Sequence, residues 1–531
     1  MTSPARIPRT SGEVLIEPPL DEWEAVANAN ARAARSWTFI VGDADAVTIR
    51  RMAREEALAL SRADCERLGI ACGHEPDPDA LVVMTGHQPD LFHPGVWAKH
   101  FAVDGFAHCE GRVALDLVVD SDEARKVSLH VPCPPGEPSS SCDVVLVGAA
   151  RGSCYACEPP PDPEQVEEFI EAATDAIERS GHRPALHNFG RFADRLRQAS
   201  ACAGPPVETV VAARRRYEHE AGTRYGEVFV SRQSQTRCFK AFAAEVIADA
   251  WRFADIFNDE VRRYRAETKT RSKAHPFPEL QVAGEAVEVP FWALVGRARR
   301  RVAYDPRGGR LLVEDAAPVD AGRDPRSVMR ALDQSGLVIV PRAVTLTMFQ
   351  RLFVADLFVH GVGGAAYERV TDAVIERWFG IVPPRYAVVS LTMRLRAEAA
   401  LTVHGSLAEA QRRLRRAIHN PEEMLGEAGL ADDESRALAE GLAEEKRRLL
   451  AALAAGEGDA RELGMAIRDV NERLRAAIAP FVEALKGEVA RLEAAAAQED
   501  RYADRTVSFP LFDPRTVAGA VLSHTSQHGV S

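Results

Sequence analysis

The stretch TGHQPDLFHPGVWAK follows the apolar run LVVM and carries the residues best suited to ligand chemistry. A buried strand that ends in a polar turn and a helix start is where α/β enzymes bind ligands. Imidazole, amide and ammonium groups there can hold a phosphate or carboxylate and stabilise charge in a transition state. Glycines let the ligand approach the backbone closely. The residues concerned are Gly86, His87, Gln88, His93, Gly95 and Lys99.

Acidic residues end the next apolar segment. Residues 112–120, RVALDLVVD, predict a buried strand, and Asp120, Asp122 and Glu123 stand at its end. In a parallel sheet this end lies beside the histidine-bearing turn, so the acids are candidates for binding a substrate amine, a ribose hydroxyl or Mg²⁺. Asp120 is the best single candidate. Each candidate also has a purely structural explanation. His87 and Gln88 can satisfy the backbone groups of their own turn, Lys99 can be solvated, and the acids at 120–123 can form an exposed turn.

Two later segments are weaker candidates. Residues 270–292, TRSKAHPFPELQVAGEAVEVPFW, place basic residues and His275 before an apolar strand, which suits either anion recognition or a solvated linker. In FVHGVGGAAYE, His360 precedes a glycine-rich turn that contains Gly363, which suits an anion site or a tight helix–helix turn. The pattern is neither G-x-G-x-x-G nor a P-loop. No G-x-S-x-G or H-E-x-x-H occurs, so serine-triad and zincin chemistry have no support.

The nine cysteines all lie in the first half of the chain. Four are close in sequence, at Cys133, Cys142, Cys154 and Cys157, and the last two form a C-x-x-C. Zinc would need four such ligands in tetrahedral reach, and the spacing favours ordinary reduced thiols instead. A disulfide framework is not expected in a large chain of this kind. We predict no metal ligands, and the sequence leaves the use of a metal open.

The bulk composition is that of a protein without membrane spans. The chain has 531 residues, 46% hydrophobic and 27% charged, which is ordinary for a globular protein of two or three domains. Its net charge of −12 argues against a nucleic-acid partner. No apolar run approaches the ~20 residues of a membrane span, and the N-terminus lacks the apolar core of a signal peptide. The expected compartment is the cytoplasm, and the expected partner is a small molecule.

The order of elements predicts a doubly wound parallel sheet. A helix at 47–70, a strand at 80–84, a helix at 94–107 and the strand at 112–120 give the β-α-β order. Residues 205–265 predict helix almost throughout. The parallel pattern is expected to return with strands at 287–295, 336–341 and 387–391 and helices at 344–360 and 365–379.

The C-terminal part differs from the rest of the chain in amino-acid composition. Alanine, leucine, glutamate and arginine at helical spacing predict long antiparallel helices in a coiled-coil hairpin, with Pro480 interrupting one of them. The tail RTVSFPLFDP carries aromatic anchors for docking onto the main domain. The predicted divisions are 1–159 (core, with an N-terminal lead-in), 160–275 (mostly helical insertion), 276–392 (core), 393–500 (helical arm) and 501–531 (tail).

The layout resembles the bacillithiol-biosynthesis cysteine-adding enzyme family, which pairs a Rossmann-like domain, related to nucleotidylyltransferases, with a long C-terminal coiled coil. The family's TGQQ-x-G-L turn and helical lysine are similar to residues 85–95 and Lys99 here, and its acidic turn to 120–123. The tail RTVSFPLF is similar to its arginine–x–x–NFLPF ending. Histidine replaces the first glutamine of the turn, and the Pro-Gly-Glu after the glycines is missing. Further similar positions are Arg342, Gly363, Gly364 and Tyr367.

This resemblance implies a ligase that joins an amino acid such as cysteine to the amine of a sugar conjugate, with ATP or ADP as a second ligand. It implies that His87, His93 and Lys99 stabilise an anion, that Asp120 orients an amine or acts as a base, and that Arg342 binds a carboxylate. The arm would form a homodimer or close over the nucleotide. The alternatives are a nucleotidyl- or glycosyltransferase of the same fold and a non-catalytic scaffold.

Overall fold

The computed structural model describes residues 6–523 apart from positions 76, 110, 134–138, 140, 149, 151, 202–203, 271, 273–276, 396 and 431. The chain forms two compact units. The first runs up to Met393 and resumes at Arg505, and the second is Arg394–Asp504. None of the described helices combines the length and the apolar character needed to cross a lipid bilayer.

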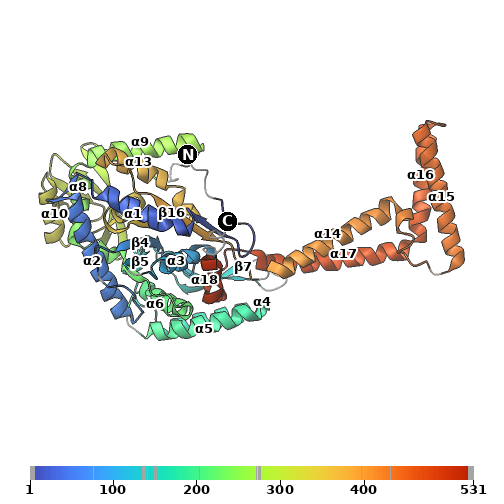
Figure 1. Ribbon diagram of the computed structural model, residues 1–531, viewed down its shortest axis with the longest axis horizontal. Helices are drawn as coiled ribbons and strands as arrows, with labels where there is room; N and C mark the ends of the chain where they lie inside the picture. Colours follow the sequence, from blue (N-terminus) through green and yellow to red (C-terminus); the bar gives the residue numbers. More distant parts are fainter. Residues whose placement is uncertain are drawn as a thin grey trace. The chain divides into compact units, whose positions relative to one another are not determined.

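The main sheet of the first unit has the strand order β1, β16, β15, β4, β5, β8 (Figure 1). Five strands run parallel, and β1 is antiparallel to β16. Numbered along the chain, the parallel strands lie in the order 3-2-1-4-5 of doubly wound folds. The predicted α/β class with a parallel sheet is confirmed. The strands are β1 (Val14–Glu17), β4 (Leu81–His87), β5 (Arg112–Val118), β8 (Gly226–Phe229), β15 (Leu357–His360) and β16 (Tyr386–Leu391).

Alternation along the strands gives the sheet two different faces. Met84 and Leu115 belong to the large apolar core that includes residues of α2 (Ala46–Leu68). Asp116 points to the opposite face, where α3 (Pro94–Phe106) covers the sheet. Pro94 occupies the first helical turn of α3, where its missing N–H costs nothing. The sheet therefore has one apolar face and one face that admits charged groups.

Two strands of the sheet lie where helix was predicted. β8 interrupts residues 205–265, and β15 replaces the end of the predicted helix 344–360. The helix there is α11 (Ala343–Phe349), followed by the π-helical turn η4 (Gln350–Val354). Asp356, held by Arg50 at 2.8 Å, separates this turn from β15. A four-residue apolar run such as LFVH has no period that distinguishes a buried strand from a helix.

A second sheet is antiparallel, with the order β13, β12, β11, β10, β14. The prediction that 287–295 and 336–341 rejoin the parallel sheet is wrong. β10 turns into β11 through Gly296, whose φ of +59° suits a tight hairpin. A separate hairpin pairs β6 with β7. These strands are β6 (Val127–Pro132), β7 (Ser141–Val147), β9 (Val282–Ala283), β10 (Ala286–Val295), β11 (Ala298–Asp305), β12 (Arg310–Val313), β13 (Val319–Asp320) and β14 (Val338–Pro341).

Both ends of the first unit fold onto it. The predicted lead-in contains β1, α1 and the short pair β2 (Ile40–Val41) and β3 (Ala44–Asp45). The tail docks through Phe509, which contacts the rings of Trp97 and Phe192, as its aromatic residues predicted. The remaining helices are α1 (Trp23–Ala34), α4 (Pro163–Ser180), α5 (Arg183–Ser200), α6 (Pro206–Glu218), α7 (Val230–Gln233), α8 (Arg237–Ala248), α9 (Ala250–Thr268), α10 (Pro325–Gln334), α12 (Val362–Ala365), α13 (Glu368–Phe379) and α18 (Pro514–Leu522).

The second unit consists of two helix pairs. α14 runs beside α17 and α15 beside α16 (Figure 1). The Lys446 ammonium is buried where the pairs meet and binds Glu422 and Asn471, both at 2.7 Å. The chain breaks between α16 and α17 next to Pro480, as predicted. A coiled coil stays a prediction. The helices are α14 (Ala397–His419), α15 (Asp433–Ala455), α16 (Ala460–Ala477) and α17 (Ala479–Asp500).

Candidate functional site

A cavity of about 680 Å³ opens at the carboxyl edge of the parallel sheet. Side chains that follow β4, β5 and β15 line it, and the second sheet supplies a facing wall. Its size is in the range of small-molecule sites. The residues predicted from sequence that line it are Gly86, His87, Gln88, His93, Gly95, Lys99, Asp122, Arg342, His360, Gly363 and Gly364.

The position of the cavity follows from the strand order. β4 and β15 are neighbours at the centre of the sheet. The chain leaves β4 toward β5 on one side and leaves β15 toward β16 on the other. The two connections diverge and leave a crevice, which is the topological switch point where open α/β sheets bind ligands. The structure thus brings the turn after His87 and the glycine turn after His360 to one place.

The N-terminus of α3 forms one wall. His93 is its N-cap, and its Nδ1 accepts a hydrogen bond from the backbone N–H of Gly95 at 3.0 Å. A Cβ on Gly95 would lie 2.6 Å from the Leu391 carbonyl oxygen, so only glycine fits there. The helix start therefore lies close against β16. Its amide groups and dipole favour an anion on the cavity side.

Lys99 supplies a buried positive charge one turn into α3. It is 2% exposed, and its Nζ donates to the Gly86 carbonyl oxygen at 2.7 Å. No carboxylate among the described residues lies within ion-pair distance of this ammonium. Burial lowers the pKa of Lys99 to about 8, although the charge of Asp116 acts in the opposite direction. An ammonium with only a neutral partner can stabilise an incoming anion.

The imidazoles of His87 and His360 in the cavity are neutral near neutral pH. His87 Nδ1 lies 3.0 Å from the Gln88 carbonyl oxygen, so Nδ1 carries the proton and Nε2 carries the lone pair. Burial, with the Lys99 charge, lowers the pKa of His87 to about 3. Burial and the charge of Arg351 lower the pKa of His360 well below its usual value. Near neutral pH these rings act as hydrogen-bonding groups, whereas the positive charge comes from lysine and arginine.

The facing wall carries residues that the sequence did not single out. Trp292 of β10 lies under the Arg342 guanidinium, 3.9 Å from the ring centroid, and the Arg299 guanidinium lies 5.0 Å from the same ring. Each arginine is held by an acid, Arg342 by Glu288 at 2.6 Å and Arg299 by Asp122 at 2.7 Å. Arg299 stands in the run ARRRVAYD, where nothing in the sequence separates it from its neighbours.

Apolar side chains complete the cavity. They come from α9, from the segment that precedes β9 and from the start of α11, and Arg505 enters from the tail. A pocket with an apolar wall and a cationic wall suits an amphipathic anion. These apolar residues are Phe257, Phe277, Leu280, Val344 and Leu346.

Of the three acids predicted for the site, only Asp122 lines the cavity. Asp122 lines the cavity and accepts from Gln88 Nε2 at 3.0 Å. Asp120 does not line it, because its carboxylate accepts from the backbone N–H of Ser231, at 2.8 Å, and from the hydroxyl of the same residue at the start of α7. Burial raises the pKa of Asp120 to about 6. Glu123 is exposed and accepts from the Gly152 N–H at 3.1 Å. The sequence could not predict where these side chains point. β5 ends at Val118, and the orientation of each acid depends on the conformation of the turn that follows.

Four further predictions concern other parts of the chain. Tyr367 packs against the rings of Tyr264 and Phe277. His275 lies outside the described residues. No group of three metal-ligating side chains occurs in the part of the chain that the structure describes. The expectation of reduced thiols is wrong at one pair, because a tight turn brings Cys154 and Cys157 into a disulfide, with 5.2 Å between their Cα atoms.

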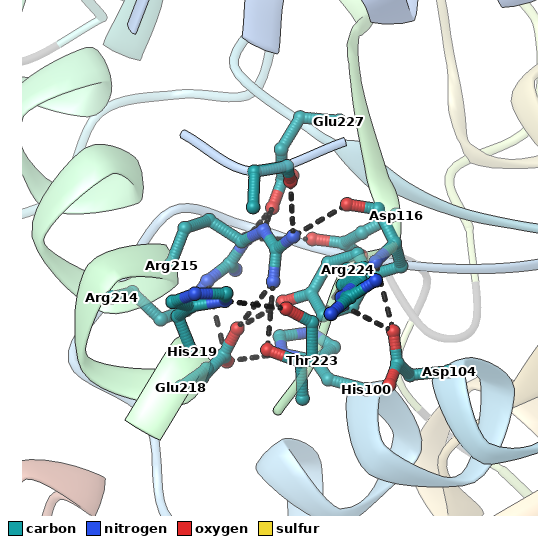
Figure 2. A network of polar contacts seen from close by, with 12 residues as sticks. His100, Asp104, Asp116, Arg214, Arg215, Glu218, His219, Thr223, Arg224 and Glu227 are labelled. Atoms are coloured by element: carbon teal, nitrogen blue, oxygen red, sulfur yellow. Dashed lines mark hydrogen bonds and ion pairs between the residues drawn. The ribbon is translucent and has the colours of Figure 1, made fainter. Parts of the chain in front are cut away.

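A second charged cluster lies behind the cavity, between the sheet and the helices α3 and α6 (Figure 2). Asp116 and Glu227 are register partners on β5 and β8, and the Arg214 guanidinium binds both, at 3.0 and 2.6 Å. His100 Nδ1 lies 3.0 Å from Glu218, which also contacts Arg215. We call these six residues the buried charge layer.

The charges in this layer are nearly balanced. Its three carboxyl groups face the two guanidinium groups. Burial and the neighbouring Asp116 raise the pKa of Glu227 well above its usual value, whereas the charge of Arg214 and a hydrogen bond from His100 hold the pKa of Glu218 at about 2 despite burial. Burial lowers the pKa of His100. The raised pKa favours a protonated Glu227, and with a neutral imidazole this leaves two ionised acids against two arginines.

No protein-family model matches this chain, and no curated protein matches it. Among solved structures, a tyrosyl-tRNA synthetase complexed with L-tyrosine from Archaeoglobus fulgidus is similar over 86% of this chain and 99% of that chain. The sequence identity is 12% and the TM-score is 0.22, which is too low to support an argument about fold or function.

Proposed function

We propose that this chain is an enzyme that joins an amino acid to the amine of an amino-sugar conjugate, with ATP or ADP as a second ligand. One observation carries the proposal: the buried Lys99 ammonium has a carbonyl oxygen as its partner and faces a cavity at the switch point of a parallel sheet. A phosphate or carboxylate would supply the missing counter-charge. The resemblance to the cysteine-adding enzymes of bacillithiol biosynthesis supplies the class of reaction.

The residues divide the reaction between two walls. Lys99 and the first turn of α3 hold the phosphate of the nucleotide and stabilise the negative charge of the leaving group. Arg342, stacked on Trp292, binds the carboxylate of the amino acid. A carboxylate oxygen of the amino acid attacks a phosphorus of ATP and displaces pyrophosphate or ADP, which forms the activated acyl group. The amine then attacks the acyl carbon, the amide bond forms, the bond from the acyl carbon to the phosphate oxygen breaks, and the amine proton passes to solvent. His87 Nε2 accepts a hydrogen bond from the attacking amine, because its lone pair is fixed on that nitrogen.

The apolar wall suits the remainder of the ligand. Phe257, Phe277 and Leu280 can cover the base of a nucleotide, and this contact adds affinity without adding charge. Glycines after His360 allow a ligand to lie against the backbone of that turn. The ligand expected from both walls is thus an anion with a flat or apolar body.

Calorimetry and product analysis test the proposal. The full chain is titrated with ATP, ADP, amino acids and amino sugars, and mixtures are assayed for amide product, pyrophosphate and phosphate. A bound nucleotide at a hundredfold excess over its dissociation constant raises the free energy of unfolding by ~2.7 kcal/mol. Amide formation that requires ATP supports the proposal. Pyrophosphate without amide indicates a nucleotidyltransferase, and no binding of any anion points to a scaffold; either outcome contradicts it.

Matched lysine variants locate the binding. Lys99→Met removes the cavity ammonium, whereas Lys126→Met changes an exposed lysine that pairs with Asp143 on a separate hairpin. We expect the first variant to lose anion binding and the second to retain it. Equal binding by both variants would show that the anion lies elsewhere.

We also propose that the unit Arg394–Asp504 joins two copies of the chain. Its helices α15 and α16 expose Leu438, Met465 and Leu450, which are 62%, 51% and 43% exposed. Burying such side chains in a partner removes apolar surface from water. Sedimentation of the full chain and of a Leu438→Glu, Met465→Glu variant tests this, since a dimer that survives both charges would not use this face.

A further inference from the structure

The disulfide between Cys154 and Cys157 closes the turn that supports one wall of the cavity. The turn includes the 3₁₀ segment η2 (Tyr155–Cys157). The Cys154 side is fully buried, whereas Cys157 is partly exposed to solvent. Cys157 is therefore the more accessible residue of the pair, and Cys154 faces the interior.

Backbone hydrogen bonds tie this turn to the acidic segment after β5. The N–H of Ala156 donates to the Asp120 carbonyl oxygen at 2.8 Å, and the N–H of Tyr155 donates to the Asp122 carbonyl oxygen at 3.2 Å. In the other direction, the N–H of Ala124 donates to the Ser153 carbonyl oxygen at 2.7 Å. The disulfide-closed turn thus fixes the backbone that aims Asp122.

A side-chain contact ties the same turn to the histidine-bearing loop. The Tyr155 hydroxyl donates to the Asp90 carboxylate at 2.8 Å. Asp90 lies between Gln88 and His93, which both line the cavity. One short turn therefore holds two of the loops that form the cavity, and Asp122 joins them by accepting from Gln88.

We propose that the Cys154–Cys157 disulfide is a thiol–disulfide exchange site and that its opening loosens the Asp122 and Asp90 loops of the cavity. The substrate class is a small monothiol or dithiol. The site does not require the proposed ligase reaction. It requires a reductant that reaches Cys157 and a turn that relaxes when its covalent closure is lost.

The exchange proceeds in two balanced steps. A small thiolate attacks Sγ of Cys157, so a mixed disulfide forms and the Cys154 sulfur leaves as a thiolate. A second small thiolate attacks the small-molecule sulfur of the mixed disulfide, releases Cys157 as a thiolate and forms a small-molecule disulfide. Overall, one protein disulfide and two thiols give two protein thiols and one small disulfide, with two electrons transferred to the protein.

Another cysteine pair provides an internal control. Cys133 and Cys142 lie on the β6–β7 hairpin and are free thiols. Burial, together with the neighbouring Cys133 thiol, raises the pKa of Cys142 to about 11, so the Cys142 thiol keeps its proton and reacts slowly. Neither residue lines the cavity. A response confined to the Cys154–Cys157 pair is therefore distinguishable from general oxidation.

Hydrogen exchange of the full chain tests the proposal without any ligand, so failure of the proposed ligase function leaves the readout intact. The oxidised protein is compared with protein treated with dithiothreitol, and differential alkylation with mass spectrometry reports the state of each cysteine. We expect the amides of Ala124, Tyr155 and Ala156 to exchange about tenfold faster after reduction. Unchanged exchange after verified reduction, or a pair that is already alkylated before reduction, overturns the proposal.

Two variants complete the test. Cys157→Ser is expected to show the fast exchange of the reduced protein and no response to dithiothreitol. Cys142→Ser keeps the wild-type response because it leaves the turn intact. A Cys157→Ser protein whose exchange equals that of the oxidised wild type would show that the covalent closure does not hold the loops. Since the wild type itself is measured in both redox states, poor folding of a variant does not remove the test.

Discussion

The cavity and the buried charge layer use neighbouring residues of one helix in opposite ways. Lys99 turns toward the cavity and has a carbonyl oxygen as its partner, whereas His100 turns toward Glu218 and Asp116. The ring of Phe92 lies between His87 of the cavity and His100 of the layer, with centroid distances of 5.2 and 5.4 Å. An aromatic ring thus separates a site with uncompensated charge from a layer with paired charge.

The difference shows what makes a charged cluster a candidate site. The layer holds more charged groups than the α3 wall of the cavity, yet its two arginines are matched by two ionised acids. A buried cluster whose charges are paired with one another stabilises the fold and is costly to break. It does not need a ligand to supply a counter-charge. In the cavity, the Lys99 ammonium has only a carbonyl oxygen as its partner and lies next to open volume, so an anionic ligand can supply the missing negative charge. Charge balance, rather than charge density, distinguishes the two.

The largest effect is expected from breaking the layer. Arg214→Met removes the guanidinium that binds Asp116 and Glu227, which leaves the buried Asp116 without a guanidinium partner. We expect the free energy of unfolding to fall by about 3–5 kcal/mol in urea denaturation. Glu227→Gln is the matched control, because glutamine resembles the protonated form that the raised pKa favours. A large fall in the free energy of unfolding of Glu227→Gln would contradict the view that Glu227 is protonated.

Removing the cavity charge should separate binding from stability. Lys99→Met is expected to weaken the binding of ATP or inorganic phosphate by at least about tenfold, since a charge-assisted contact contributes about 1.5–3 kcal/mol. The free energy of unfolding should rise by about 1 kcal/mol, because an uncompensated buried ammonium is replaced by an apolar chain. Calorimetry and urea denaturation of one preparation measure both. If Lys99→Met is as destabilising as Arg214→Met, the distinction between the two regions fails.

The sequence located the cavity better than it located the fold around it. The turn after β4 could be predicted because an apolar run, two glycines and a helix start are local signals. β15 could not be predicted as a strand, since LFVH has no period of its own and its partner β4 is 274 residues away in the chain, where Leu357 pairs with Val83. The second sheet could not be predicted for a similar reason. The segments 287–295 and 336–341 are apolar, and an apolar strand fits a parallel or an antiparallel sheet equally well.

The site residues show the same limit. His87, Lys99 and Arg342 line the cavity because each sits at the end of a strand or the start of a helix that was predicted or matched by resemblance. Trp292 and Arg299 come from the antiparallel sheet, whose place opposite α3 no local pattern reveals. Asp120 points away from the cavity, since the direction of a side chain in a turn after a strand depends on long-range partners such as Ser231.

The cavity charge should also respond to pH. The pKa of Lys99 is lowered to about 8, so affinity for an anion is constant below pH 8 and falls about tenfold per unit above it. Its unfolded pKa is near 10.5, so the unfolded chain binds more protons between pH 8 and 10.5, and the free energy of unfolding rises with pH across that window. Calorimetric titrations of the wild type from pH 6.5 to 9.5 measure the first effect. The Lys99→Met variant should show neither slope.

The smallest effect tests an acid that belongs to neither region. The pKa of Asp120 is raised to about 6 from 3.8, so the folded protein binds more protons than the unfolded chain between these values. Stability from this group is present at low pH and is lost as pH rises from 4 to 6, by about 2 kcal/mol. Asp120→Asn keeps an acceptor for the Ser231 N–H and has no charge to bury, so it should gain stability over the wild type as pH rises through this range. Urea denaturation at pH 4, 5, 6 and 7 measures the difference. A difference that does not change with pH would contradict the raised pKa, since it would mean that the hydrogen bonds from Ser231 offset the effect of burial on Asp120.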